Sequence, residues 1–384
     1  MIHLLLIIIY FSFISLGLPD ALLGSAWPLM YPRFQVPVSY AGIIFAVTSV
    51  GTVVSSLNSD RLTKRFGPGK VTAVSVAMTM AALFGYSFSD SFLELLLWSI
   101  PCGLGAGSVD AALNNYVALH YKSHHMSWLH CMWGIGASLG PYVMSGVLTG
   151  GGIWNEGYRV IGFIQLALTI VLFLTLGLWK TNGKQEVQQE AYEPLTLPKI
   201  LAIPRAKEMM LTFFCYCAME QTAGLWASSY LVLHKGLSEE VAARFASLFF
   251  IGITAGRAFS GFLTMRFDDK TMIRMGQAVI AVGTVVMLLP LGETAALVGL
   301  VLIGLGCAPI YPCVIHSTPL RFGADKSQAL IGVQMASAYI GNILMPPLFG
   351  LIANHITVAL LPVYLLVILL IQLCMHERLL KICE

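Results

Sequence analysis

Charged residues are scarce in this 384-residue chain. Asp, Glu, Lys and Arg make up 11% of it, whereas soluble domains contain about 25%. Hydrophobic residues make up 57%, and the mean hydropathy is +0.79. A water-soluble fold of this length could not bury so much apolar surface, so the composition excludes an ordinary soluble domain. It predicts a polytopic α-helical membrane protein.

Other chemical patterns are also missing. No cluster of Lys and Arg is dense enough for nucleic acid, and the net charge is only +3. The eight cysteines have no spacing typical of a disulfide framework or a zinc site. No nucleophile–base pair or metal-ligand spacing is visible. We therefore expect no enzymatic activity, no metal, no cofactor and no nucleic-acid partner.

Apolar stretches long enough to cross a bilayer, about 20 residues, occur along the whole chain. The first of them lacks the basic start and the cleavage site of a signal peptide, so we expect it to be retained as a helix. We predict an all-α fold of twelve transmembrane helices, at residues 3–31, 38–58, 70–89, 92–119, 126–150, 158–179, 205–234, 239–265, 271–290, 294–317, 324–353 and 356–376.

Lys and Arg are distributed unevenly among the loops. If the N-terminus lies in the cytoplasm, seventeen of the 22 Lys and Arg residues fall on the cytoplasmic side, whereas the outside loops hold Arg33, Arg159, Lys235 and Arg244. Because positive charge is retained on the cytoplasmic side, this bias predicts that both termini are cytoplasmic. We expect a monomer that spans the plasma membrane many times.

The longest polar stretch divides the chain near its middle. Residues 180–204 begin KTNGKQEVQQEAYEPLTLPK and are predicted to form a cytoplasmic linker. The linker separates an N-terminal six-helix bundle (1–179) from a C-terminal six-helix bundle with a short tail (205–384). Repeated features support two pseudo-symmetric halves: GLG recurs at 103–105 and 304–306. Paired repeats of this kind build transporters whose binding site lies at the repeat interface.

Three carboxylates lie deep within predicted spans: Asp20, Asp110 and Glu220. An acid at the centre of a spanning helix costs about 2.5–3.5 kcal/mol on insertion scales. Structure alone gains little from such residues. Their usual interpretation is a proton- or ion-coupling group that faces a hydrated path.

Amides and aromatic residues accompany these acids. Asp110 and Asn114 are four residues apart and share a helix face. Aromatic faces combined with amides are typical of sugar-binding sites, although each aromatic could instead serve packing, and His130 could be a packing residue rather than a proton relay. The candidate substrate-binding residues are Asn114, Asn115, His130, Trp133, Gln221, Trp226, Gln334, Tyr339 and Asn342.

The loop SLNSDRLTKRFGPGK at 56–70 resembles the signature loop of the major facilitator superfamily, G-x-x-x-D-R-x-G-R-[KR]. Asp60 and Arg61 match the motif, and a basic pair ending at Arg65 follows. The resemblance implies a gate that is locked by charge-assisted hydrogen bonds in one of two states. Arg257 is a further gate candidate. In the second half, Met265 replaces the acid, so we expect a weaker latch there.

Two shorter motifs resemble the fucose–proton symporter branch of this superfamily. DAALNNY at 110–116 is similar to an acid-x-A-A-N-P-Y segment in its fourth helix, and GLPDALLG at 17–24 is similar to its first helix. The resemblance implies that Asp110 is the protonation site and that Asp20 contacts sugar or helps coupling. The chain departs from the branch pattern at Asp110, where the branch has Glu, and at Asn115, where it has Pro.

We therefore expect a secondary active transporter that couples protons to the symport of a sugar or a similar small polar solute by alternating access. Three alternatives remain open. Sodium could couple through the same acids and amides. The cargo could be an amphipathic compound that is exported by a proton gradient. A membrane scaffold without transport is the third, and it gives no reason for the three acids.

Overall fold

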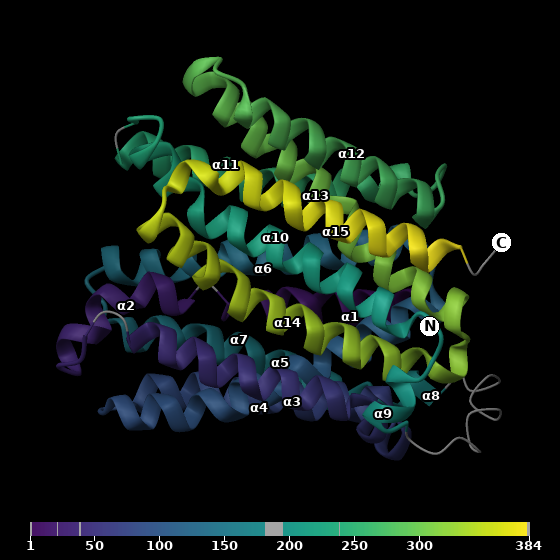
Figure 1. Ribbon diagram of the computed structural model, residues 1–384. Helices are drawn as coiled ribbons and strands as arrows, with labels where there is room; N and C mark the ends of the chain where they lie inside the picture. The colour runs from purple at the N-terminus through teal and green to yellow at the C-terminus, as the bar shows by residue number, and fades with distance from the viewer. Residues whose placement is uncertain (1, 21, 38–39, 181–194, 238, 382–384) are drawn as a thin grey trace. The chain divides into compact units, whose positions relative to one another are not determined.

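The computed structural model describes residues 2–20, 22–37, 40–180, 195–237 and 239–381. Every regular element in these ranges is helical (Figure 1). The α-helices are α1 (Ile2–Gly17), α2 (Leu22–Arg33), α3 (Ala41–Phe66), α4 (Pro68–Phe88), α5 (Phe92–His120), α6 (Ser123–Thr149), α7 (Trp154–Leu174), α8 (Leu176–Lys180), α9 (Leu197–Leu201), α10 (Ala206–Leu233), α11 (Glu239–Leu263), α12 (Asp269–Leu288), α13 (Gly292–Phe322), α14 (Ala324–His355) and α15 (Leu361–Leu380). A short 3₁₀ helix, η3 (Val358–Leu360), precedes α15.

The described helices confirm the predicted all-α polytopic fold. Ten of the described spans are long and apolar enough to cross a membrane, and α11 contributes a shorter apolar stretch, Leu248–Leu263. The 28-residue helix α10 covers the remaining predicted span. The predicted linker, 180–204, falls largely on residues 181–194, which lie outside the described residues, and its described part contains α9.

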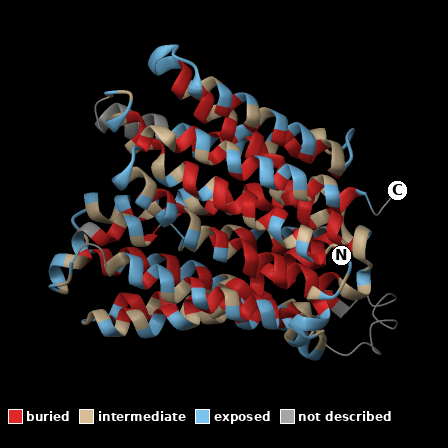
Figure 2. Ribbon diagram, viewed as in Figure 1, coloured by how far each residue is buried: buried red, intermediate tan, exposed pale blue. Residues whose placement is uncertain are grey.

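Large apolar side chains are exposed on many of these helices (Figure 2). Phe163 is 58% exposed, Leu174 81% and Phe259 64%. Exposed apolar side chains along a helix of membrane-spanning length are expected where lipid, not water, is the solvent. The chain is therefore a multi-pass integral membrane protein.

The first predicted span, 3–31, is interrupted instead of continuous. Residues Leu18–Asp20 form a turn between α1 and α2. Pro19 explains the break, because proline has no N–H to donate to the carbonyl of Ser15, four residues earlier. That carbonyl accepts a hydrogen bond from the Gln165 side chain of α7 at 2.8 Å instead. A neighbouring side chain thus satisfies the freed backbone group, as a spanning helix requires.

Contacts between residues divide the chain into two compact units. Unit 1 comprises residues 1–116, 129–195 and 324–336. Within it, α4 packs along α7, and a buried apolar core lies between α2, α4 and α7. Aromatic rings are prominent in this core: Tyr158 contacts Tyr86 with ring centroids 5.5 Å apart.

Unit 2 comprises residues 117–128, 196–323 and 337–384. Within it, α11 and α12 both pack along α13, and α10 packs along α15. The units therefore do not coincide with the predicted sequence halves. The first residues of α14 pack in unit 1, where Gln328 donates to the Ser59 hydroxyl at 3.3 Å. The predicted domain boundaries at 179 and 205 stay a prediction.

Candidate functional site

A buried chain of hydrogen bonds joins α5 to α6 in unit 1. The Asn114 amide donates to the Asp110 carboxylate at 2.8 Å. The Nε2 atom of His130 lies 3.0 Å from the Asn114 amide oxygen. All three side chains are at most 4% exposed. The sequence predicted that Asp110 and Asn114 share a face, and the structure adds His130 as the next member of the chain.

The direction of these bonds constrains the protons. Since the Asn114 nitrogen donates to Asp110, its oxygen is the acceptor that faces His130, so His130 donates from Nε2. The chain thus runs from an imidazole through an amide to a carboxylate. The edge of the Phe13 ring packs against the imidazole with centroids 5.4 Å apart. A change in the charge of Asp110 therefore alters a network that crosses from one helix to the next.

The second acid of unit 1, Asp20, lies at the break between α1 and α2. Trp133 of α6 donates its indole N–H to the Asp20 carboxylate at 2.8 Å. The close approach of α1 and α6 brings these residues together. A Cβ atom on Gly17 would lie 2.2 Å from the Trp133 carbonyl oxygen, and one on Gly136 would lie 2.0 Å from the Ile14 carbonyl oxygen. Only glycine allows two helices to pack this closely.

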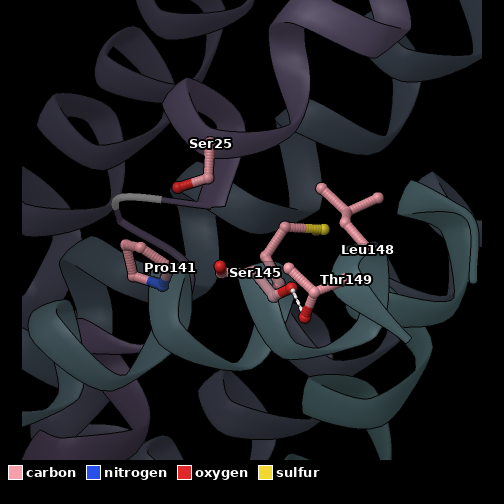
Figure 3. Close-up of a pocket in the computed structure, with 6 residues that line it drawn as sticks. Ser25, Pro141, Ser145, Leu148 and Thr149 are labelled. Atoms are coloured by element: carbon pink, nitrogen blue, oxygen red, sulfur yellow. Dashed lines mark hydrogen bonds between the residues drawn. The ribbon is translucent and has the colours of Figure 1, made fainter. Parts of the chain in front are cut away.

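A pocket of about 490 Å³ lies between α2 and α6 (Figure 3). Figure 3 shows the Ser25 side chain on α2 and, on α6, Pro141, Ser145 and Thr149. The residues that line the pocket do not include Asp20, Asp110 or Glu220. It continues the same pair of helices that holds Asp20 and Trp133, and its hydroxyl groups can bond polar solutes.

The third acid, Glu220, belongs to a different kind of cluster in unit 2. Arg257 of α11 pairs with the Glu220 carboxylate of α10 at 3.3 Å. The arginine side chain is 3% exposed and the glutamate 19%. The guanidinium also lies over the ring of Tyr311, 5.9 Å from its centroid. A buried arginine with a carboxylate and an aromatic face is a well-compensated cation.

Tyr216 completes the unit 2 cluster. Its hydroxyl lies within hydrogen-bond distance of the Glu220 carboxylate and 3.0 Å from the Cys307 carbonyl oxygen. Because a hydroxyl has one proton and both neighbours are acceptors, it can satisfy only one of them while Glu220 is ionised. Sequence reasoning missed Tyr216 and Tyr311. The position of Tyr216, four residues before Glu220 on the same helix face, was the available signal for the first.

The other candidate residues are distributed over both units. Asn115 is buried and accepts from the Ser327 hydroxyl of α14 at 2.6 Å, so it faces away from Asp110. Trp226 donates to the Pro346 carbonyl at 3.0 Å, which joins α10 to α14. Of the remaining candidates, Gln334 is buried in the unit 1 part of α14, Gln221 is exposed on α10, and Tyr339 and Asn342 are half-buried on the unit 2 part of α14.

The predicted gate residues are not all in one place. Asp60 is buried at the end of α3, where it pairs with Lys64 at 3.0 Å and accepts from the backbone N–H of Leu195 at 3.1 Å. Arg61 and Arg65 are exposed on the same helix end. Arg257 lies apart from them, in the Glu220 cluster. The gate role of these four residues stays a prediction.

Buried acids on helices of membrane-spanning length indicate a membrane transporter, and comparison with known proteins identifies the family. A sequence model of the Major Facilitator Superfamily matches residues 9–244 and 209–378. The matches cover most of the chain, so the protein belongs to this superfamily. It is a transporter and not an enzyme.

Relatives and solved structures agree with the family. Bypass of stop codon protein 6 of Saccharomyces cerevisiae is 23% identical over 389 residues, which cover 91% of this chain and 77% of that protein. The glucose/mannose transporter GlcP of Bacillus subtilis is 21% identical over 365 residues, which cover 91% and 88%.

Two solved structures share the fold. The proton:xylose symporter XylE superimposes with a TM-score of 0.80 at 14% identity, over 97% of this chain and 94% of that one. The E. coli fucose:proton symporter FucP superimposes with a TM-score of 0.76 at 15% identity, over 97% and 98%. The expected resemblance to the fucose–proton symporter branch is thus confirmed at the level of the fold.

Proposed function

We propose that this protein couples the movement of protons to the symport of a sugar, or of a similar small polar solute, by alternating access. The observation that carries the proposal is the buried chain Asp110–Asn114–His130, which places a carboxylate and an imidazole in one hydrogen-bonded network inside the spanning helices. The relatives GlcP, XylE and FucP, which are named as sugar transporters, support the substrate class.

The Asp110 network has the chemistry that proton coupling needs. The side chain of Asn114, which donates to the Asp110 carboxylate, is a neutral amide, and its N–H can bond either an ionised or a protonated carboxyl group. A neutral carboxyl group is far less costly than a carboxylate when the surroundings exclude water. Coupling then requires only that the form loaded with proton and solute changes state more readily than the half-loaded forms.

Asp20 and Trp133 provide the neighbouring solute site. The carboxylate of Asp20 is exposed, in contrast to that of Asp110, and keeps acceptor capacity beyond its bond to Trp133. An acid that accepts hydroxyl protons next to an indole ring is suited to a sugar, whose ring stacks while its hydroxyls are bonded. The pocket between α2 and α6, lined by Ser25, Ser145 and Thr149 together with Pro141, Met144 and Leu148, offers hydroxyl groups to such a solute.

The excess of Lys and Arg in one set of loops supports the orientation that we propose, with both termini in the cytoplasm of a plasma-membrane protein. In this orientation, the ends of α3, α5, α11 and α13 lie on the cytoplasmic side. Uptake from outside is then the direction that an inward proton gradient drives.

Uptake into proteoliposomes tests the proposal. The purified protein is reconstituted, an inward pH gradient is imposed, and labelled glucose, mannose, xylose and fucose are offered in turn. We expect at least one sugar to accumulate above its external concentration, and a protonophore should abolish this accumulation. Liposomes without protein are the control for passive entry.

Two results would replace the proposal with an alternative. Accumulation that follows an imposed sodium gradient at equal pH, and ignores the pH gradient, would establish sodium coupling. Proton-driven loss of an amphipathic dye, with no uptake of any sugar, would establish export of an apolar compound.

A further inference from the structure

A second cluster of titratable groups lies outside the proposed coupling site, where the turn between α5 and α6 packs against α12 and α13 in unit 2. Asp269, the first residue of α12, accepts a hydrogen bond from the Ser123 hydroxyl at 2.5 Å. Its other carboxylate oxygen lies 2.6 Å from Nδ1 of His316 on α13. The Nε2 atom of His316 lies 3.2 Å from the carbonyl oxygen of Tyr121.

The bonding partners of His316 determine how many protons the cluster contains. Both ring nitrogens face oxygen acceptors, a carboxylate at Nδ1 and a carbonyl at Nε2. A neutral imidazole has one N–H and can satisfy only one of these acceptors. The observed geometry is complete only with one more proton, either on the imidazole or on the Asp269 carboxyl group. In the absence of that proton, a ring nitrogen without hydrogen faces an acceptor at one of the two contacts, at Asp269 or at Tyr121, depending on the tautomer.

We propose that Asp269 and His316 form a proton-operated latch that holds the turn between α5 and α6 against α12 and α13. When the pair contains the extra proton, Tyr121 and Ser123 are both bonded to it. When the proton leaves, His316 can hold either Asp269 or the Tyr121 carbonyl, but not both. When the remaining proton is on Nδ1, which bonds the carboxylate of Asp269, the carbonyl of Tyr121 loses its bond to α13, and the turn is held by the Ser123–Asp269 bond.

The same segment makes a second contact within unit 2, through Trp128, and this contact contains no titratable group. Trp128, on the first turns of α6, donates its indole N–H to the Ala258 carbonyl of α11 at 3.3 Å. Its ring also meets Phe262 edge to face, with centroids 5.5 Å apart. Residues 117–128, which belong to unit 2, thus contact its other helices at two places: one contact is neutral and largely apolar, and the other is the latch.

The surroundings of the pair contain charges of both signs. His124 interacts electrostatically with both Lys122 and His316, and a charge on His124 opposes a charge on the His316 imidazole. Asp268 interacts with Cys313 close to the pair and favours it. The elements packed here contain further charged and titratable groups: His120, Lys122, His124 and His125 on the segment, Asp268, Lys270 and Arg274 on or next to α12, Cys313 and Arg321 on α13, and Glu220 with Arg257 where α10 and α11 pack on α13.

The sequence did not predict the Asp269–His316 latch. Met265 replaces the acid of the loop motif in the second half, which predicted a weak latch there. The structure supplies an acid four residues later, at Asp269, and adds a histidine that the motif does not contain. In the proposed orientation the latch lies on the cytoplasmic side, so cytoplasmic protons would hold it closed and slow the release of solute.

Hydrogen exchange of residues 117–128 tests the latch directly. The full-length protein in lipid nanodiscs is measured from about pH 6 to about pH 8, the range in which histidine titrates, with exchange rates corrected for their intrinsic pH dependence. In the wild type, we expect protection of the segment to fall by about tenfold as pH rises, the effect of losing one hydrogen bond to a charged group. In His316→Gln, protection should be lower and independent of pH.

Two further variants keep the test decisive. Trp128→Phe removes the neutral contact and should lower protection equally at every pH. Asp269→Asn retains an acceptor for Ser123 but removes the carboxylate, so it should behave like His316→Gln. The proposal would be wrong if protection of residues 117–128 did not depend on pH in the wild type, or if its pH dependence persisted in His316→Gln.

The expected effect of the latch on solute release rests on the proposed function, whereas the hydrogen-exchange measurement is independent of that function. Constant protection combined with proton-driven sugar uptake would remove the latch and leave the transporter proposal intact. If protection of residues 117–128 depends on pH but sugar uptake does not respond to a proton gradient, the latch is retained and the proposed proton coupling is wrong.

Discussion

The two units hold their buried acids in opposite ways. In unit 1, Asp110 accepts a hydrogen bond from the neutral amide of Asn114, which in turn bonds His130. In unit 2, Glu220 pairs with the permanent charge of Arg257. In the first arrangement, the amide of Asn114 can bond Asp110 in either of its protonation states. The second resists protonation, because a neutral Glu220 would leave a buried guanidinium without its counterion.

This difference indicates that Asp110 and Glu220 have distinct roles, although both are acids within apolar stretches of the sequence. A group that must load and release a proton in each cycle needs partners that tolerate both of its forms. A group that compensates a buried cation needs to stay ionised. We therefore expect Asp110 to dominate coupling and the Glu220–Arg257 pair to dominate stability. Four variants test this difference between the two units.

Asp110→Asn should have the largest effect on transport. The amide cannot take up a proton, so the accumulation ratio of the sugar should fall to about 1, while exchange of labelled for unlabelled sugar persists. Accumulation and exchange are compared in the same proteoliposomes. Asp90→Asn, which makes the same change at an acid that is 83% exposed, should behave like the wild type. Full accumulation by Asp110→Asn would remove Asp110 from coupling.

Arg257→Gln should have the largest effect on stability. It leaves Glu220 buried without its cation, and breaking one partner of a buried pair costs about 3–5 kcal/mol. Thermal unfolding in detergent measures the loss. The double variant Arg257→Gln/Glu220→Gln should recover most of it, because both charges are then absent. If the double variant is as unstable as Arg257→Gln, the pair is not the source of the effect.

Trp133→Phe should weaken solute binding by a smaller amount. It removes the indole donor of Asp20, and a hydrogen bond to a charged group is worth about 1.5–3 kcal/mol, so KM for the sugar should rise by about tenfold. Trp226→Phe is the matched control, since that indole donates to the Pro346 carbonyl. It should lower the melting temperature and leave KM unchanged. Equal KM values for the two variants would contradict a solute-binding role for Trp133.

His130→Gln should have the smallest effect. Glutamine can still donate to Asn114 but does not titrate, so the rate at optimal pH should be retained and the pH profile should flatten between about pH 5 and pH 8. Uptake is measured across this range at a constant proton gradient. His355→Gln, at an exposed histidine that ends α14, supplies the comparison. A profile identical to that of the wild type would place His130 among packing residues.

Much of the fold and part of the site could be predicted from the sequence. The twelve spans were visible because a bilayer requires each backbone polar group to be satisfied within its own helix, which demands long apolar stretches. Asp20, Asp110 and Glu220 were identified because an acid in such a stretch is costly. The pairing of Asp110 with Asn114 followed from their spacing of four residues on one helix.

The partners across helices could not be predicted. Asn114 and Asn115 are chemically identical neighbours, yet one bonds His130 on α6 and the other bonds Ser327 on α14. Successive residues on a helix point about 100° apart, so the rotation of each helix within its bundle decides their roles. The same holds for Arg257, whose partner Glu220 lies 37 residues earlier, and for His316, which meets Asp269 and Tyr121 through packing alone.

By itself, the sequence determined that this protein spans a membrane as a bundle of helices and that three acids lie within them, since apolar length and the cost of buried charge are local properties of the chain. Only the packing of the helices showed that the Asp110–Asn114 pair is bonded to His130 and that Glu220 meets the cation of Arg257. These pairings depend on how helices rotate and approach one another, through contacts such as Gly17 against Trp133 that bring distant residues within reach.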